Sequence, residues 1–474
     1  MKLKPITFEH LLYLVAMLLG LSLRLVGLGA APLTDTEATW ALQALAGSQG
    51  SLGQFLDPQP AYVSLTRWLF ELFGSTNFLV RLWPALTGSL LVLLPLFIRN
   101  ALIRPWQDRR AGQSEDLPLL SRQAALVLAF GLALSPGLVV VSRQAGSPMP
   151  ALSLSLVAIG LFLSRRPGVL FDSCVAGAVA GLALLSGPAA VHGLLVLGST
   201  LAAYWLMNKT SPTQLDLEQE HAIGQPDLKW FGLSLAGSVI LGSSSFLSDP
   251  RGLAAWFETL PAYFRAWLGN PGMPGLRLLA ALLIYQPIAV IFGLIGGIKA
   301  GFFSGERRNR VLGLVLLFWI VVGLGLALLN PARQASNLIW VLVPAWILAA
   351  TEIAKVFPTE KINLTSTLHA ILLVIFMGLL WYSLASLSRF QAEDPERTAR
   401  IFIILGILAL TALTSILIQL GWSWEVARRG ISWGSLGALS LFSISMLWGA
   451  AFLRPNQPQE LWSLTPGSGE TDLM

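Results

Sequence analysis

The sequence predicts an all-α, polytopic membrane protein with about 13 transmembrane helices and amphipathic interfacial helices in its loops. Hydrophobic residues make up 54% of the 474-residue chain and charged residues only 12%, and the mean hydropathy is +0.68. Apolar runs of about 20 residues, the length that crosses a bilayer, recur between clusters of Arg, Pro, Gly and Asp. This composition excludes an ordinary soluble domain.

The predicted spans follow one another along the whole chain. They lie near residues 8–29, 78–99, 122–141, 149–164, 170–186, 188–207, 230–247, 276–298, 311–329, 335–355, 367–388, 400–420 and 432–453. The fourth and fifth are short, so a tilted or re-entrant segment is the alternative for each. Loss of one span would invert every later loop.

The distribution of basic residues predicts the orientation in the plasma membrane. With the N-terminus in the cytoplasm, 19 of the 31 Lys and Arg residues, including all of the lysines, fall on the cytoplasmic side. The C-terminus is then extracytoplasmic. The net charge of +6 is explained by these topology signals and predicts no nucleic-acid partner. The single cysteine, Cys174, excludes an internal disulfide.

Four outer segments, 30–77, 142–148, 248–275 and 330–334, are longer or more polar than a simple turn requires. Within them, 37–46 and 62–73 are amphipathic, and the third segment carries aromatic residues at roughly helical spacing. We expect these amphipathic segments to cover a cavity that is open to both lipid and water. The predicted divisions are a core over 1–355, variable helices over 356–453 and an extracytoplasmic tail over 454–474.

The first outer loop places two carboxylates, Asp35 and Glu37, beside the membrane, where acids are costly and usually functional. A carboxylate there can take the proton from an attacking hydroxyl or amine. The alternative is structural: Thr34 or Asp35 caps a helix, and Glu37 favours the helix dipole. One residue can do both.

Several motifs on the predicted outer side of the membrane, taken in their order along the chain, indicate a family resemblance. They are Asp35-Thr36-Glu37, Pro60-Ala61-Tyr62, Leu72-Phe73-Gly74, Val80-Arg81-Leu82-Trp83-Pro84-Ala85 and Pro331-Ala332-Arg333-Gln334. Over roughly residues 8–355 the chain resembles the GT-C glycosyltransferases, in the branch of dolichyl-phosphate-mannose protein mannosyltransferases and bacterial aminoarabinose transferases. The sequence departs from many relatives because Thr36 separates the two acids and the turn 143–148 contains none.

The resemblance implies transfer of a sugar from a polyprenyl-phosphate donor to an extracytoplasmic protein, lipid or glycan acceptor, with inversion. Asp35 or Glu37 is then the catalytic base. The candidate donor-phosphate residues are Arg333, Arg143 and Arg81. The candidate substrate-lining residues are Gln59 and Tyr62, for which packing is the alternative, and Tyr263 and Trp267, for which the alternative to stacking on a sugar or lipid is an aromatic belt at the membrane interface. For the arginines, interaction with lipid headgroups is the alternative. A divalent cation on Asp35, Glu37 and either Asp57 or Asp249 is a candidate cofactor that nothing in the spacing demands.

Two other functions stay open from the sequence. The interrupted acidic motif favours a catalytically inactive GT-C-like scaffold or assembly subunit. A transporter of lipid-linked glycans would need ionisable residues deep inside several spans. Few are visible in this chain.

Overall fold

The computed structural model describes residues 7–49, 57–98, 121–165, 169–209, 225–357, 363–387, 394–455, 457 and 460–462. Regular structure in these ranges is entirely helical, which confirms the predicted all-α class. The first helices are α1 (Phe8–Leu25), α2 (Asp35–Ser48), α3 (Pro60–Phe73), α4 (Asn77–Leu90), η1 (Leu91–Leu93), α6 (Arg122–Leu134), α7 (Pro136–Ser142), α8 (Pro148–Ser164), α9 (Leu170–Leu184) and α10 (Pro188–Lys209). The others are α12 (Gln225–Ser243), α13 (Arg251–Arg265), α14 (Gly275–Tyr285), α15 (Pro287–Phe303), α16 (Arg307–Leu329), η2 (Ala335–Leu338), α17 (Ile339–Ala354), α18 (Leu364–Leu387), α19 (Pro395–Gly421), α20 (Trp424–Trp448) and η3 (Gly449–Leu453).

The chain divides into two compact units. The first comprises Met1–Thr351 with Met446–Met474, and the second comprises Glu352–Ser445. The second contains α18, α19 and most of α20, whose many exposed apolar side chains suit contact with lipid. The segment after α20 belongs to the first unit, where it reaches the candidate site described below.

Each of the thirteen predicted spans coincides with a helix or a pair of helices. Among the described residues, eight helices are long and apolar enough to cross a membrane, or up to ten if each of two bent pairs counts as one span. The remaining segments are the short helices α8 and α9, together with α12. The exact count of thirteen crossings is therefore not confirmed, because length and apolarity alone do not qualify these three helices.

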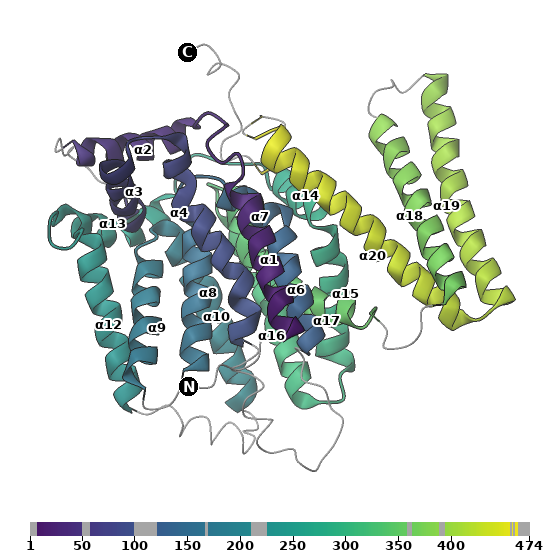
Figure 1. Cartoon of the computed structure of the whole chain (residues 1–474), viewed down its shortest axis with the longest axis horizontal. Helices are drawn as coiled ribbons and strands as arrows, with labels where there is room; N and C mark the ends of the chain where they lie inside the picture. The colour runs from purple at the N-terminus through teal and green to yellow at the C-terminus, as the bar shows by residue number, and fades with distance from the viewer. Residues whose placement is uncertain are drawn as a thin grey trace. The chain divides into compact units, whose positions relative to one another are not determined.

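The four segments predicted to share one side meet at one end of the first unit. Ser147 Oγ donates to Gln59 Oε1 at 2.5 Å, and Thr259 Oγ1 lies 3.5 Å from the carbonyl of Pro58. On the far side, the Met273 N–H donates to the carbonyl of Arg333 at 3.0 Å. Figure 1 shows α2 lying crosswise at this end of α9 and α12. Here the short loop helices α2, α3 and α13 pack together.

Two helix breaks bring buried polar groups together inside this unit. Pro136 has no N–H, so the Leu132 carbonyl loses its helical donor and the α6–α7 pair bends by 51°. Arg24, which is 0% exposed, donates from Nη2 to that carbonyl at 3.1 Å. Ser135 Oγ at this break donates to Gln286 Oε1 at 2.9 Å, and Gln286 lies at the 87° break between α14 and α15.

Close packing of α10 against α17 depends on a glycine, and this generates a first prediction. A Cβ on Gly193 would overlap the ring of Trp340, which is 1% exposed. Overpacking of this kind costs about 1–3 kcal/mol. We expect Gly193→Ala to lower the unfolding temperature of the purified protein in detergent.

Gly198→Ala in the same helix is the matched control, because no atom lies within 4 Å of a Cβ at that position. This variant should leave the unfolding temperature unchanged or slightly higher, since alanine favours helix over glycine. Equal unfolding temperatures for the two variants would contradict the described packing.

Candidate active site

The first acidic motif forms a capped helix start. Thr34 is the N-cap of α2: the Glu37 N–H donates to Thr34 Oγ1 at 3.3 Å, and the Thr34 N–H donates to Glu37 Oε2 at 2.9 Å. This reciprocal pair is a capping box, which satisfies two donors that a helix N-terminus leaves open. The cap is thus Thr34 and not Asp35, which is the first residue of α2 and has an exposed side chain.

Glu37 is also one half of a buried ion pair with Arg81 of α4. Arg81 Nε donates to Glu37 Oε1 at 2.9 Å and Nη2 donates to Oε2 at 2.7 Å, and the two residues are 3% and 0% exposed. The Ala145 N–H adds a third donor, 2.8 Å from Oε1. This two-point geometry is the strong arrangement of an arginine and a carboxylate. It also occupies both oxygens of Glu37.

The remaining donors of Arg81 shape the loop between α1 and α2. Nη1 lies 3.3 Å from the carbonyl of Leu28 and 2.9 Å from that of Ala31, and Nη2 lies 2.8 Å from that of Pro32. A loop beside a membrane carries backbone carbonyls that need donors. Arg81 supplies them, so the ion pair and the loop conformation depend on one another.

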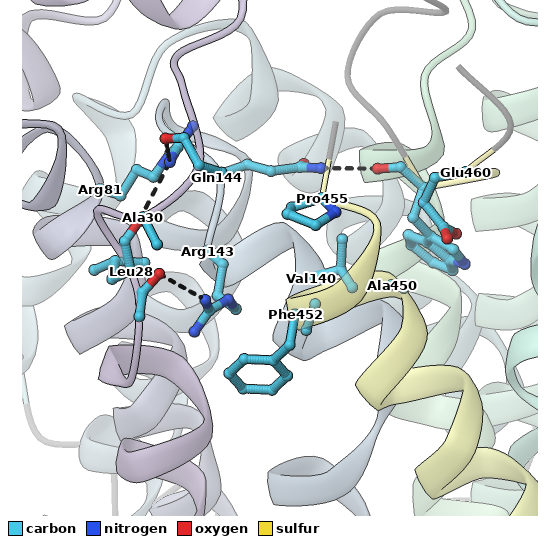
Figure 2. Close-up of a pocket in the computed structure, with 14 residues that line it drawn as sticks. Leu28, Ala30, Arg81, Val140, Arg143, Gln144, Ala450, Phe452, Pro455 and Glu460 are labelled. Carbon is cyan, nitrogen blue, oxygen red and sulfur yellow. Dashed lines mark hydrogen bonds between the residues drawn. The ribbon is translucent and has the colours of Figure 1, made fainter. Parts of the chain in front are cut away.

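A small pocket of about 130 Å³ opens beside this loop, and we call it pocket 1. Figure 2 shows Arg81 and Arg143 on one side of it and Glu460 on the other. Its lining comes from the loop after α1, from α4 and α7, from η3 and from the C-terminal segment, as Leu28, Ala30, Arg81, Val140, Arg143, Gln144, Phe452, Pro455, Glu460 and Trp462 show. Five parts of the chain therefore build it.

Arg143 gives pocket 1 its positive charge. Its guanidinium donates to backbone carbonyls at the end of α1, among them Leu23 at 3.0 Å and Val26 at 2.7 Å, and lies over the Phe452 ring at 4.5 Å. Within the described ranges no carboxylate is in salt-bridge distance of Arg143. Burial, together with the charge of Arg81, lowers the pKa of Arg143 to about 10, so the group stays charged at pH 7.

The C-terminal segment completes pocket 1 and was not anticipated as part of a site. Gln144 reaches across the pocket, and its Nε2 donates to the carbonyl of Trp462 at 2.8 Å (Figure 2). Trp462 is 1% exposed and packs where Gly137 of α7 has no side chain. Glu460, 3% exposed, places its Oε2 3.8 Å from Arg454 Nε. The signal in the sequence is Trp462, the single tryptophan of the tail over 454–474.

The expected substrate-lining residues lie elsewhere. Gln59 is buried between Ser147 and Asp57, to which its Nε2 donates at 3.2 Å. Trp40 Nε1 also donates to Asp57, at 3.0 Å, and burial outweighs these bonds and raises the pKa of the Asp57 carboxyl. Tyr62 is 1% exposed and donates from its hydroxyl to the Val80 carbonyl at 2.7 Å.

Tyr263 and Trp267 lie on α13 and just after it, with ring centres 6.4 Å apart. The Tyr263 hydroxyl is 3.3 Å from Nδ1 of His192 in α10. These two residues, like Gln59 and Tyr62, line neither pocket 1 nor the second pocket described below. Their contact with a sugar stays a prediction.

Arg333 is separate from the other two expected phosphate ligands. Its Nη1 donates to the Leu328 carbonyl at 3.1 Å at the end of α16, and it lines neither pocket. For a metal, the ranges that the structure describes hold no group of three His, Cys, Asp or Glu side chains able to bind one ion. Asp57, Asp249 and Glu37 each have their own partners instead.

The fold is similar to that of ArnT from Cupriavidus metallidurans. A crystal structure of ArnT bound to undecaprenyl phosphate matches with a TM-score of 0.52 and 14% identity, covering 94% of this chain and 76% of ArnT. Its apo structure matches with a TM-score of 0.52 and 15% identity, covering 93% and 76%. The chain thus has an ArnT-like fold, in agreement with the resemblance that the sequence motifs indicate. No protein-family profile and no curated protein sequence matches it.

The Glu37–Arg81 pair generates a prediction on stability. Glu37→Gln should lower the free energy of unfolding by about 3–5 kcal/mol, because it leaves the Arg81 charge buried without a carboxylate. Arg81→Met should have a similar effect, and the double variant should lose less than the sum of the two. The free energy of unfolding is measured in detergent, with tryptophan fluorescence as the signal that monitors unfolding.

Glu71→Gln is the control for this experiment. It removes an ion pair with Arg67 of similar length, 2.8 Å, whose side chains are 39% and 24% exposed. Such exposed pairs contribute about 0–1 kcal/mol. A loss for Glu37→Gln no larger than that for Glu71→Gln would show that the pair is not buried as described.

Proposed function

We propose that the protein is a membrane glycosyltransferase that transfers a sugar from a polyprenyl-phosphate donor to an acceptor outside the cytoplasm. The observation that carries this proposal is pocket 1, where Arg143 has a charge that no described carboxylate balances. A lipid phosphate would supply the missing negative charge. The ArnT-like fold supports the same ligand class, since ArnT has been crystallised with undecaprenyl phosphate.

In this proposal, Arg143 binds the donor phosphate, and Arg81 lines the same wall with its charge offset by Glu37. Arg81 is less available than Arg143, because the Glu37 carboxylate already pairs with the Arg81 charge, whereas Arg143 bonds to backbone carbonyls. The volume of pocket 1, about 130 Å³, suits a phosphate group rather than a whole lipid-linked sugar. Arg333 stays a predicted second contact to the lipid phosphate, from a different part of the fold.

We assign the role of catalytic base to Asp35. Both oxygens of Glu37 accept strong hydrogen bonds, whereas the Asp35 side chain is exposed at the start of α2. The Asp35 carboxylate takes the proton of the acceptor hydroxyl while the acceptor oxygen bonds to the anomeric carbon. The bond from that carbon to the phosphate oxygen breaks, polyprenyl phosphate leaves, and the anomeric configuration inverts. Because the proposed acceptor lies outside the cytoplasm, the proposal places the site on the extracytoplasmic side and the N-terminus in the cytoplasm.

A non-catalytic scaffold with a GT-C fold is the second candidate. It is favoured by the arrangement of the acids, since Glu37 is saturated with donors and Asp35 lines neither pocket. Both candidates bind a lipid phosphate at pocket 1, but only the enzyme needs Asp35, as its catalytic base. Binding and transfer therefore have to be measured separately.

Lipid binding is predicted to depend on Arg143. Undecaprenyl phosphate should raise the unfolding temperature of the wild-type protein in detergent, and Arg143→Gln should weaken its affinity about 10-fold or more, the effect of losing one charge-assisted hydrogen bond. Arg122→Gln, at the exposed start of α6, is the control and should bind as the wild type does. Equal affinity of the Arg143 and Arg122 variants would contradict a phosphate at pocket 1.

Transfer is predicted to depend on Asp35. Purified protein supplied with radiolabelled polyprenyl-phosphate sugars and an acceptor panel should form labelled product, and Asp35→Asn should lower the rate by about 100-fold or more. Asp394→Asn, just before α19 in the second unit, is the matched control. Lipid binding without transfer by any variant would support the scaffold.

A further inference from the structure

A second and larger cavity is lined by α2 and α3 of the first outer segment and by residues 243–252, and we call it pocket 2. It measures about 360 Å³, within the range of about 300–1,000 Å³ typical of small-molecule sites. Three segments build it: α2, α3 and the turn that joins α12 to α13. The polar part of its lining includes Thr39, Gln43, Ser64, Arg67, Asp249 and Arg251.

The charges of pocket 2 are balanced, in contrast to pocket 1. Arg67 Nε lies 2.8 Å from Glu71 Oε1, and Arg251 Nε lies 3.3 Å from Asp249 Oδ1. Asp249 is 5% exposed and also accepts from the Arg251 N–H at 3.1 Å. A pocket whose cations are already paired does not favour a phosphate. Among its apolar residues it offers hydroxyl and amide groups, which both donate and accept, and the Asp249 carboxylate, which accepts; a polyhydroxylated ring needs both donors and acceptors.

The wall of pocket 2 contains a strained turn. Ser245, Phe246 and Leu247 follow one another with φ angles of 49°, 58° and 67°, a region that costs a residue with a side chain about 1–3 kcal/mol. The turn is held by Ser245 Oγ, which donates to Ser64 Oγ at 2.8 Å, and by the Phe246 ring stacked on Trp68. Strain of this kind persists where the surroundings enforce it, and it gathers at functional sites.

The face of α2 that lines pocket 2 begins at the proposed base. Asp35, Thr39 and Gln43 are spaced by four residues, so they lie on one side of the helix. Thr39 and Gln43 line the pocket, and Asp57 orients Gln43 by donating its N–H to Oε1 at 2.9 Å. A ligand in pocket 2 would therefore lie along the side of α2 that has Asp35 at its N-terminal end.

From these observations we infer that pocket 2 binds the acceptor as an uncharged, polyhydroxylated sugar, with Thr39, Gln43 and Asp249 as its polar contacts. This inference rests on the proposed glycosyltransferase function. The inference goes beyond the proposed function because it assigns the acceptor and the donor phosphate to different pockets. Pocket 1 recognises an anion, and pocket 2 recognises hydroxyl groups. The acceptor is then a glycan or a glycosylated molecule.

The test is saturation-transfer NMR of free disaccharides with the purified full chain. The probes are maltose, mannobiose and chitobiose, and the detergent must lack a sugar headgroup so that it does not compete. We expect at least one probe to bind, and Gln43→Ala or Thr39→Val to weaken it about 5-fold, as the loss of one neutral hydrogen bond does. Gln123→Ala, exposed near the start of α6, should leave binding unchanged.

The outcomes separate this inference from the proposed function. Added inorganic phosphate should leave disaccharide binding unchanged, since pocket 2 carries no unpaired cation in this assignment. With active protein, Gln43→Ala should raise the KM for the acceptor about 5-fold and leave the KM for the donor lipid unchanged.

Disaccharide binding that Gln43→Ala weakens, in a protein without transferase activity, would support the site and overturn the enzyme. Transfer without disaccharide binding, or with an unchanged acceptor KM in both pocket 2 variants, would overturn the site and leave the enzyme standing.

Discussion

The buried pair of Glu37 and Arg81 is the constraint on which the candidate site depends. Removing two charges from water costs several kcal/mol each, so both must be fully bonded, and they are. In meeting this requirement the pair joins the start of α2, the middle of α4, the loop carbonyls and the backbone after α7. The same bonds neutralise Arg81 and leave Arg143 as the cation of pocket 1 that no carboxylate among the described residues pairs with. One interaction therefore shapes the loop and also sets the charge of the pocket beside it.

The two helix breaks also help to position the residues of pocket 1. Pro136 and Pro287 interrupt apolar helices, and each break exposes backbone and polar groups that cannot be left unpaired in a membrane protein. Arg24 satisfies the carbonyl freed at Pro136, and Ser135 joins this break to Gln286 at the other. Because α7 leaves the break at a new angle, Arg143 and Gln144 at its end reach pocket 1. Gly137 at the start of α7 leaves room for Trp462, which brings the C-terminal segment to the same place.

The two pockets differ in the way that a transferase with two unlike substrates requires. Pocket 1 is small and positively charged, while pocket 2 is larger and mainly apolar, with a few polar side chains and with its charges paired. Helix α2 takes part in both arrangements, since Glu37 supports the wall of pocket 1 and Thr39 and Gln43 line pocket 2. In the proposed reaction, Asp35 at the head of this helix acts on an acceptor that reaches it from pocket 2.

By itself, the sequence determined the all-α membrane fold, the approximate position of the long apolar helices and the grouping of the four polar loops, because hydrophobicity acts locally along the chain. It also singled out Glu37, Arg81 and Arg143 individually, since charged residues beside a membrane stand out. It did not show the breaks that divide two of the predicted spans. Only the tertiary structure decided that Glu37 bonds to Arg81, 44 residues away, that Thr34 is the cap, and that Gln144, Glu460 and Trp462 line pocket 1. Those contacts join segments up to 318 residues apart, and no local pattern records which distant groups burial will bring together.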